Sequence, residues 1–574
     1  MSDEIQDYAL KHSCSHLMAS AIQSLFPDVT FAIGPPIKDG FYYDFGNIKI
    51  SEEDLPKIEA KMKEIAKKNL KFEELEKTVE EAKKTLKNQP FKLEILQDLK
   101  GRITFYKHGE FIDLCEGHHV RYTKEIKHFK LMKVAGAYWR GDEHKQMLTR
   151  IYGVVFKTKE ELDNYLKLLE EAKKRDHKKL GKELDLFTFS QLVGPGLPLW
   201  TPKGTIVRNL IDEFIWALRQ AHGYQKVVIP HITKKDLYET SGHWKKYQNE
   251  LFKITTREGH LLAMKPMNCP HHAQIFNRKP WSYKELPQRY CETTMVYRDE
   301  QTGELAGLSR VRSISQDDAH VFCTQEQTER EIEIIWDIVN RFYKTFNFAL
   351  TIRFSRHDPA SFEKYLGTQE IWKLAEQQML NVVKKRKATY VDGLGEAAFY
   401  GPKIDFIAVD SLGREWQIAT IQLDFNQPER FNLTYASEKN SEERVVMIHA
   451  AIAGSLERFI SILLEHTSGN LPLWLNPTQV KILTVTDRNN EFAEEVKKEL
   501  EQNNIRVELD AKGETIGRKV REAQLEKVNY AVTLGDKEME KKTLAVRTRE
   551  GKVTFGVTIK DFIAQLTKEI SEKK

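Results

Sequence analysis

Three groups of residues in the sequence have the types and the spacing to do chemistry, and the first lies near the N-terminal end. His12 and His16 stand four residues apart in KHSCSHLMASAI, and on a helix this spacing puts both imidazoles on one face. Much further along, DLCEGHH adds Asp113, Cys115 and His119. Such nitrogen and sulfur ligands suit either zinc binding or water-activating hydrolysis. The alternative to a chemical role is that His12 and His16 are simply structural, as a pair of core or capping histidines.

The second group is a set of three metal-ligand types that lie far apart in the chain. Cys269 occurs in KPMNCPHH, His320 in QDDAH and His449 in VMIHAAIAGSLERF, each at the end of an apolar run that reads as a strand. Three such ligands would hold zinc and leave one or two coordination positions for a substrate. Three ligands so scattered in the chain are, without further context, a signal of low specificity.

The third group consists of arginines framed by apolar runs. Arg298 occurs in MVYRDE, Arg310 in LSRVRS and Arg458 in GSLERF. Guanidinium groups that converge on a pocket bind phosphates and stabilise charge on a transferring phosphoryl group. The sequence has no Gly-x4-Gly-Lys-Ser/Thr motif, so a P-loop is excluded and a nucleotide would be held another way. For any single arginine, a surface ion pair is the ordinary alternative.

Hydrophobic periodicity predicts the elements that would position these groups. Residues 51–98 are charge-dense, with Leu55, Ile58, Met62 and Ile65 at helical spacing, and predict amphipathic helices with a solvated outer face. The stretch HGYQKVVIPHI predicts a helix end followed by an edge or terminal strand.

A second charged run, residues 158–184, predicts a connecting helix with Leu162, Tyr165, Leu168 and Leu169 along one stripe. Composition then changes to Gly, Pro and aromatic residues, which marks a domain boundary. After LPLWLNP the chain repeats strand, helix, strand, helix, strand, as in a small α/β domain with an open sheet. The predicted domains are residues 1–157, a linker 158–184, residues 185–472 and residues 473–574.

Length and composition bound the class of protein. A chain of 574 residues with 40% hydrophobic and 30% charged residues should form about three or four globular domains. No run approaches the ~18 apolar residues of a membrane span, and five scattered cysteines argue against a disulfide scaffold, so we expect a cytoplasmic protein without membrane contact. Residues 511–574 hold 15 basic against 10 acidic residues, compatible with nucleic-acid contact or with an ordinary lysine-rich surface.

Taken together, these motifs resemble those of the class II aminoacyl-tRNA synthetases. The stretch from Gly223 to Pro230 resembles motif 1, YRDE at 297–300 motif 2, and GSLER at 454–458 motif 3. NCP, QDDAH, AFYGPKID, WQIATIQLDF and VMIH resemble more closely the threonyl-tRNA synthetase family, from about residue 8 to the C-terminal end. The resemblance implies an α+β multidomain fold, in which a class II antiparallel sheet with flanking helices lies between an N-terminal α/β editing domain and a C-terminal α/β anticodon-binding domain.

The resemblance also implies a role for each matching residue. It implies zinc ligands Cys269, His320 and His449, and a threonine site of Gln316, Asp318, Tyr400 and Gln422. It implies an ATP site of Arg298, Glu300, Arg310, Gln417, Thr420 and Arg458, with Lys403 near the reacting phosphate and His243 near the tRNA 2′-hydroxyl. It implies an editing site of His12, His16, Lys92, Asp113, Cys115 and His119, and anticodon contacts from Arg521, Glu538 and Arg547.

The activity implied by the resemblance is ATP-dependent ligation of L-threonine to tRNA(Thr) through a threonyl-adenylate, with hydrolysis of mischarged seryl-tRNA(Thr). Mg²⁺ would enter with ATP, and motif 1 implies a homodimer. A catalytically inactive relative would require the loss of an arginine or a zinc ligand, and none is missing. A free-standing zinc hydrolase built on the HxxxH pair would leave most of the chain unexplained. A seryl- or prolyl-specific relative is the nearest competitor, and Cys269, His320 and His449 argue against the prolyl one.

Four features depart from the family pattern. Relatives usually begin with a small ubiquitin-like domain, for which the residues before His12 leave no room. His271 stands in place of a glycine after NCP, Ala450 in place of an arginine after the zinc histidine, and Gly513 in place of an anticodon-reading asparagine. None of these replacements removes a ligand, but they put the shape of the pocket and the anticodon contacts in question.

Overall fold

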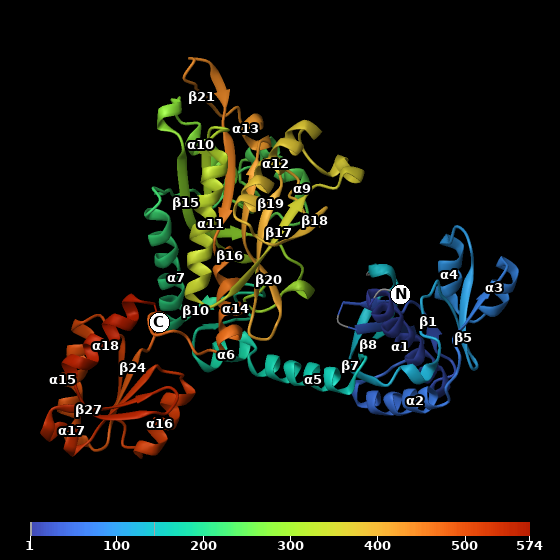
Figure 1. Ribbon diagram of the computed structural model, residues 1–574, viewed down its shortest axis with the longest axis horizontal. Helices are drawn as coiled ribbons and strands as arrows, with labels where there is room; N and C mark the ends of the chain where they lie inside the picture. Colours follow the sequence, from blue (N-terminus) through green and yellow to red (C-terminus); the bar gives the residue numbers. More distant parts are fainter. Residues whose placement is uncertain (1–2, 39, 143, 574) are drawn as a thin grey trace. The chain divides into compact units, whose positions relative to one another are not determined.

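The computed structural model describes residues 3–38, 40–142 and 144–573. They belong to two compact bodies, which divide between Glu170 and Glu171. Both bodies combine helices with largely antiparallel sheets, which confirms the expected multidomain α+β class (Figure 1). Among the described helices, none has both the length and the apolar character needed to cross a lipid bilayer.

The first body is a sheet packed against a long helix. Helix α1 (Asp3–Leu25) carries His12 and His16 and buries Cys14 and Leu17 in the core. The main sheet has the strand order β1-β3-β8-β7 with β2 on β3, and a smaller sheet has the order β4-β5-β6. The strands are β1 (Thr30–Phe31), β2 (Pro36–Ile37), β3 (Gly40–Gly46), β4 (Glu73–Glu76), β5 (Thr104–His108), β6 (Phe111–Leu114), β7 (His128–Tyr138) and β8 (Met147–Phe156).

The charged stretch 51–98 is only partly helical. Helix α2 (Leu55–Lys67) buries all four residues of the predicted stripe, and it is followed by α3 (Val79–Thr85) and α4 (Pro90–Asp98). Between α2 and α3 the chain forms strand β4, where a helix was predicted. Backbone pairing of Glu73–Glu76 with β5 overrides the local charged composition, and most of these side chains stay in solvent.

The second body is built on an eight-stranded sheet of order β11-β15-β16-β23-β20-β19-β17-β18. The pairs at its two edges are parallel and all others antiparallel. As predicted after Gly223, the short strand β11 is an edge strand. The strands are β11 (Gln225–Lys226), β15 (Gln288–Tyr297), β16 (Ser313–Cys323), β17 (Ala349–Arg356), β18 (Tyr390–Leu394), β19 (Lys403–Val409), β20 (Glu415–Asp424) and β23 (Val446–Ala451).

Helices α7 (Pro202–Gln220), α11 (Thr328–Thr345) and α14 (Leu456–Thr467) lie on one face of this sheet (Figure 1). Alternate strand residues such as Val321 and Ile448 join these helices in the largest core. Because strand residues alternate between faces, the intervening positions point to the opposite face. That face carries the polar residues predicted to do chemistry.

Smaller elements border the eight-stranded sheet. Short sheets have the orders β12-β14-β13, β10-β9 and β21-β22. They comprise β9 (Phe187–Thr188), β10 (Leu199–Trp200), β12 (Ile232–Lys234), β13 (Lys253–Thr255), β14 (Leu261–Met264), β21 (Thr434–Ala436) and β22 (Glu442–Arg444). The remaining helices here are α8 (Lys235–Ser241), α9 (His243–Lys246), α10 (Cys269–Phe276), α12 (Gln369–Lys385) and α13 (Asn426–Arg430).

The C-terminal residues of the second body form a five-stranded sheet of order β25-β24-β26-β27-β28. The predicted alternation is confirmed as β24 (Val480–Thr484), α15 (Asn490–Gln502), β25 (Val507–Asp510), α16 (Ile516–Leu525) and β26 (Tyr530–Leu534). Beyond that pattern the chain adds α17 (Asp536–Lys541), β27 (Thr543–Thr548), β28 (Val553–Thr558) and α18 (Ile559–Ser571).

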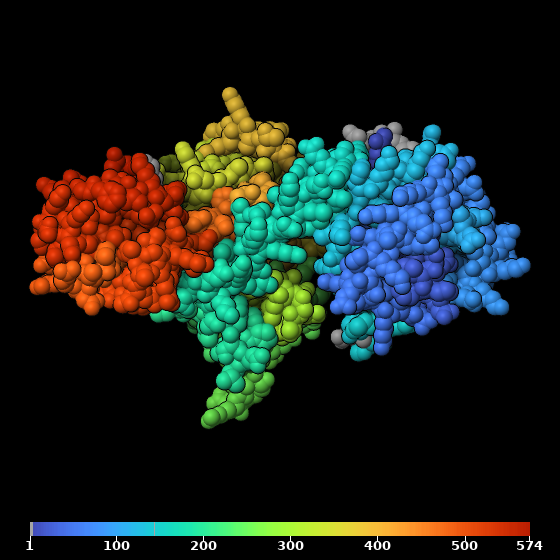
Figure 2. Space-filling model, turned by 90° about the horizontal axis from the view of Figure 1, so that it is seen from below, coloured from blue at the N-terminus to red at the C-terminus, as the bar shows by residue number. Residues whose placement is uncertain are grey.

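The predicted connecting helix is two helices, α5 (Lys159–Lys174) and α6 (His177–Glu183). The prediction of a single helix was wrong because Asp176 begins a new one, its side chain accepting the backbone N–H of Lys178. Helix α5 buries none of its side chains completely, and residues in this teal part of the colour range are visible at the surface in Figure 2.

Candidate functional site

Strand register puts four predicted site residues in one row across the eight-stranded sheet. His320 on β16 lies opposite His449 on β23. His449 lies opposite Gln422 on β20, which in turn lies opposite Lys403 on β19. Directly paired residues share a face, so residues far apart in sequence converge there. Both histidines lie inside their strands, not at strand ends as predicted, because the cavity opens on the face of the sheet.

The predicted zinc ligands come together. Cys269, His320 and His449 each place a donor atom within 4.8 Å of the others, and all three are buried. Nε2 of His320 lies 3.0 Å from Nδ1 of His449, while their other nitrogens face His272 at 2.8 Å and Asp424 at 3.0 Å. Such outer partners fix the tautomer of a metal-binding imidazole. One thiol and two imidazoles are a normal zinc donor set, so the residues fit this ion.

A cavity of about 460 Å³ is lined by these ligands and by the residues predicted to bind an amino acid. The Asp318 carboxylate accepts from the Asn268 amide at 3.1 Å and lies 3.7 Å from Nε2 of His320. The Tyr400 hydroxyl donates to the side-chain oxygen of Gln422. The wall therefore offers oriented polar groups beside the metal ligands, which suits a small zwitterion with a polar side chain.

A second cavity of about 430 Å³ is lined by Arg298, Arg310, Gln417 and Arg458, among others. Arg298 and Gln316 line both cavities, so the two spaces meet at these side chains. Nε of Arg298 is buried and has no hydrogen-bond partner in the described chain. An unpaired cationic donor on a cavity wall is suited to an anion such as a phosphate.

The loop and helix that carry the arginines are held locally. Arg298 directly follows β15, and its backbone N–H donates to the carbonyl of Arg312 at 2.9 Å. The guanidinium of Arg310 lies 2.7 Å from the carboxylate of Glu300. Arg458 lies in the first turn of α14, where the Ser455 side chain caps the helix.

One carboxylate that the sequence reasoning missed organises three predicted residues. Asp405 is fully buried and accepts from Gln417 at 2.8 Å and from Thr420 at 2.9 Å. Nζ of Lys403 lies 3.2 Å from its other oxygen, which also accepts from the Ser355 hydroxyl. Thr420 lines the cavity of the candidate metal ligands and not the arginine-lined cavity.

His243 lies beside Cys269, one of the three candidate metal ligands. Its ring is fully buried, with Nδ1 2.7 Å from the Ser241 hydroxyl and Nε2 4.0 Å from Sγ of Cys269. Burial lowers its pKa to about 3, so the imidazole is neutral at pH 7. It is not among the residues that line either cavity.

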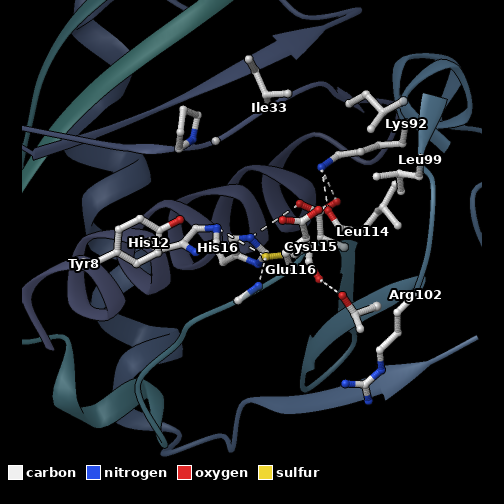
Figure 3. Close-up of a pocket in the computed structure, with 16 residues that line it drawn as sticks. Tyr8, His12, His16, Ile33, Lys92, Leu99, Arg102, Leu114, Cys115 and Glu116 are labelled. Atoms are coloured by element: carbon white, nitrogen blue, oxygen red, sulfur yellow. Dashed lines mark hydrogen bonds and ion pairs between the residues drawn. The ribbon is translucent and has the colours of Figure 1, made fainter. Parts of the chain in front are cut away.

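The N-terminal cluster forms a separate cleft in the first body. A cavity of about 340 Å³ is lined by His12, His16, Lys92, Asp113 and Cys115, and Figure 3 shows the two histidines beside Cys115 while Lys92 reaches in from another wall. Four donor atoms, from His12, His16, Cys115 and His119, lie within 4.8 Å of one another.

Burial keeps the imidazoles and the thiol of this cleft uncharged. It lowers the pKa of His12 to about 4 and also lowers the pKa values of His16 and His119. It raises the pKa of the Cys115 thiol to about 12. Sγ of Cys115 lies 3.4 Å from Nε2 of His12 and 3.3 Å from Nε2 of His119. At pH 7 the cleft therefore presents neutral imidazoles, whose ring nitrogens can accept a proton from water, and a protonated thiol.

Lys92 and Asp113 form a buried ion pair at 2.7 Å on the wall of the cleft. The Tyr43 hydroxyl donates to the same carboxylate at 2.5 Å, and Nε2 of His16 lies 3.8 Å from it. Sequence reasoning missed Tyr43, although the aromatic residues Phe41, Tyr43 and Phe45 stand at every second position and could have placed it on the core face of β3.

The predicted anticodon residues lie on three elements of the C-terminal five-stranded sheet and its helices. Arg521 is exposed on α16, and the Glu538 carboxylate accepts the backbone N–H of Gly535 at 3.1 Å. Arg547 on β27 donates to the carbonyl of Gly551 at 3.1 Å. A basic side chain at an exposed surface is available to a phosphate or a base edge.

The three replaced residues occupy different environments. His271 is buried on α10 with both ring nitrogens lacking a partner in the described chain. Ala450 is buried on β23 and lines the cavity of the candidate metal ligands. A Cβ at Gly513 would meet no described atom within 4 Å, so the backbone there leaves room for a side chain.

Comparison with known proteins agrees with this architecture. Family models match for the tRNA synthetase class II core domain (G, H, P, S and T) at residues 252–467, for an anticodon binding domain at 479–569, and for the threonyl and alanyl tRNA synthetase second additional domain at 103–152. The eight-stranded sheet with its paired cavities is thus the core of a class II aminoacyl-tRNA synthetase, an enzyme.

The relatives narrow the family. The chain is 48% identical over 572 residues to the threonine–tRNA ligase of Flavobacterium johnsoniae and 45% identical over 569 residues to that of Thermotoga maritima, each alignment covering 98% of this chain and 88% of the relative. A solved RNA binding domain of threonyl-tRNA synthetase from Cryptosporidium parvum matches with a TM-score of 0.66 and 36% identity, over 69% of this chain and 98% of that one. The chain belongs to the threonine–tRNA ligase family.

Proposed function

We propose that this enzyme ligates L-threonine to tRNA(Thr) through a threonyl-adenylate and hydrolyses seryl-tRNA(Thr) in the cleft of its first body. The observation that carries the proposal is the position of Arg298 and Gln316, which line both the cavity of the metal ligands and the cavity of the arginines. An amino-acid carboxylate held in the first cavity can therefore reach a phosphate held in the second.

Activation is an in-line attack of the threonine carboxylate on the α-phosphorus of ATP, which enters with Mg²⁺. Negative charge grows on the phosphate oxygens, and the unpaired Nε of Arg298 is suited to stabilise it. Arg458 and Arg310 on the wall of the second cavity bind the distal phosphates, and Lys403 lies near the reacting one. No protein base is needed, because a carboxylate is already a competent nucleophile.

Threonine poses a selection problem on two sides. Cys269, His320 and His449 would hold zinc. When bound, the ion would supply free coordination positions for an amine and a hydroxyl group at the same time. Asp318 would accept from the same hydroxyl or amine, so valine would leave the carboxylate oxygen that does not bond to Asn268 without a partner and be rejected by ~10⁴-fold or more. Serine satisfies the same contacts and lacks only a methyl group, worth about 1–3 kcal/mol. A second, hydrolytic site is therefore required.

The cleft of the first body is suited to that hydrolysis. His12, His16 and His119 are neutral imidazoles that can position water and take its proton, and Cys115 can orient the ester. The Lys92–Asp113 ion pair sets the charge of the wall. We favour hydrolysis without a tightly held metal, with zinc at these four donors as the alternative.

The remaining assignments concern the contacts with tRNA, the domain boundaries, the oligomeric state and the location of the protein. Arg521, Glu538 and Arg547 would contact the anticodon, and His243 would act near the terminal ribose of tRNA, although it lies behind Cys269. The domain boundaries at 157, 184 and 472, the homodimer and the cytoplasmic location stay predictions.

The proposal is tested by charging tRNA(Thr) transcript with labelled threonine and, in a separate reaction, by incubating the enzyme with seryl-tRNA(Thr). We expect ATP-dependent threonyl-tRNA in the first reaction and release of serine in the second. Failure of the first would reject the ligase, and failure of the second alone would reject the proofreading role of the cleft.

A further inference from the structure

His177, the first residue of α6, joins the two segments that carry the phosphate-binding arginines. Its Nδ1 lies 2.7 Å from the Glu465 carboxylate on α14, and its Nε2 accepts the backbone N–H of Leu308 at 3.1 Å. Because Nε2 accepts a hydrogen bond, the ring proton is on Nδ1 and is donated to Glu465. His177 is only 5% exposed. Both nitrogens of its neutral imidazole therefore form their hydrogen bonds within the protein.

The loop between Arg298 and Arg310 approaches this imidazole very closely. Gly307 has φ +56°, and a Cβ there would lie 2.3 Å from Nε2 of His177. Only glycine tolerates both the left-handed backbone and the close approach. The next residue, Leu308, is fully buried. The Ser309 hydroxyl lies 2.9 Å from that of Ser461 on α14, so this turn of the loop is fastened to His177 and to α14.

The other side of His177 leads to Arg458. The Glu465 carboxylate that accepts from His177 also pairs with Arg414 at 2.7 Å. The guanidinium groups of Arg414 and Arg458 lie 5.3 and 6.0 Å from the ring of Trp416. Burial raises the pKa of Glu465, but the hydrogen bonds from His177 and Arg414 outweigh burial and lower it overall. An ionised carboxylate thus anchors the imidazole on the helix that carries Arg458.

We propose that His177 is a positioning residue for ATP: it fastens the Gly307–Ser309 turn to α14, so that Arg310 on the loop and Arg458 on the helix keep a common spacing. The inference rests on the proposed function, since it concerns the ATP cavity of the ligase. His177 itself touches no substrate, because its nitrogens are occupied and it does not line the cavity. Its effect is therefore expected on the binding of ATP and not on that of threonine.

Two amide substitutions separate the two contacts of the imidazole. His177→Asn places an amide near the position of Nδ1, which can donate to Glu465 but cannot reach Leu308. His177→Gln places an amide oxygen near the position of Nε2, which can accept from Leu308. In threonine-dependent pyrophosphate exchange, we expect His177→Asn to raise the KM for ATP about tenfold, with the KM for threonine within about twofold of wild type. We expect His177→Gln to raise the KM for ATP less than about threefold.

A purely structural role would affect the two variants alike and would not single out ATP. An unchanged KM for ATP in His177→Asn, or equal increases in both variants, would overturn the inference. His260→Asn, at an exposed histidine, is the matched control. If His177→Asn does not fold, Gly307→Ala disturbs the same contact from the loop and should raise the KM for ATP in the same way. Absence of exchange in the wild type would reject the proposed function, whereas normal exchange with unchanged ATP KM values rejects the role of His177 alone.

Discussion

Oδ2 of Asp424 lies 3.0 Å from Nε2 of His449, on the nitrogen that does not face His320. The carboxylate is fully buried, and its other oxygen accepts the backbone N–H groups of Asn426 and Gln427 at 2.7 and 2.9 Å. Its orientation is therefore fixed by the backbone. It holds the proton of His449 on Nε2 and leaves the lone pair of Nδ1 directed toward the other two candidate ligands.

Asp424→Asn tests this arrangement. The amide has the same shape but carries no charge to favour the Nε2–H tautomer, so zinc affinity should fall about 10–100-fold. The measurement is zinc retained per chain after dialysis against graded chelator concentrations. Asp510→Asn, at a buried aspartate of the C-terminal sheet, is the control and should retain zinc as the wild type does. Equal retention in both variants would show that Asp424 does not orient a metal ligand.

Removal of the two helical histidines should separate the two activities. We expect His12→Ala with His16→Ala to slow deacylation of seryl-tRNA(Thr) by about 100-fold or more, since two groups that position water are lost. Threonine-dependent exchange should stay within about twofold, because the residues lie in the other body. His128→Ala is the matched control on β7. Unchanged deacylation in the double variant would show that the cleft does not take part in the hydrolysis.

The pH dependence of deacylation follows from burial of His12. A pKa lowered from 6.5 to about 4 keeps the imidazole neutral above pH 5, and activity is lost only as pH falls through about 4. The rate, corrected for uncatalysed hydrolysis, should therefore show no fall between pH 7.5 and 6. With an ordinary pKa, about three quarters of the histidine would already be protonated at pH 6. A decline with midpoint near 6.5 would contradict the neutral-imidazole account.

Arg547→Ala should weaken tRNA binding without affecting activation. Loss of a contact to a base or phosphate costs about 1–3 kcal/mol, so the KM for tRNA should rise roughly 5–150-fold. Exchange does not involve tRNA and should be unchanged. Arg518→Ala serves as the control, because this exposed arginine pairs with Glu514 and Glu522. An unaltered KM for tRNA in Arg547→Ala would mean that β27 does not contact the anticodon.

The hydrophobic periodicity of the sequence and the spacing of its residues were sufficient to predict local features of the structure. The i, i+4 spacing of His12 and His16 does place both rings on one face of α1, with centroids 5.1 Å apart. The apolar stripe of α2 and the strand–helix alternation of the tail also follow from sequence period. The break at Asp176 and the strand at Glu73–Glu76 were missed because a cap and a tertiary pairing override local pattern.

The candidate site depends on strand register, which no local pattern encodes. Ligand types identified Cys269, His320 and His449, but their convergence required β16 and β23 to pair in one particular register. Asp405 and Asp424 were missed, although each lies two residues from a predicted site residue on its strand and so shares its face. The two-residue period could have revealed them, whereas the contacts of His177 with Glu465 and Leu308 join segments too distant for any sequence pattern.

In this account one metal-assisted pocket selects threonine by its hydroxyl group. The pocket fails to reject only serine, which has the same hydroxyl but lacks one methyl group. The most direct measurement is pyrophosphate exchange with threonine, serine and valine side by side, before and after zinc is removed and restored. We predict that serine is about 10–200-fold poorer than threonine and valine ~10⁴-fold poorer or worse, with all exchange lost without zinc and recovered with it. Valine exchange comparable to that of serine, or full threonine exchange by a chain shown to hold no zinc, would contradict the account.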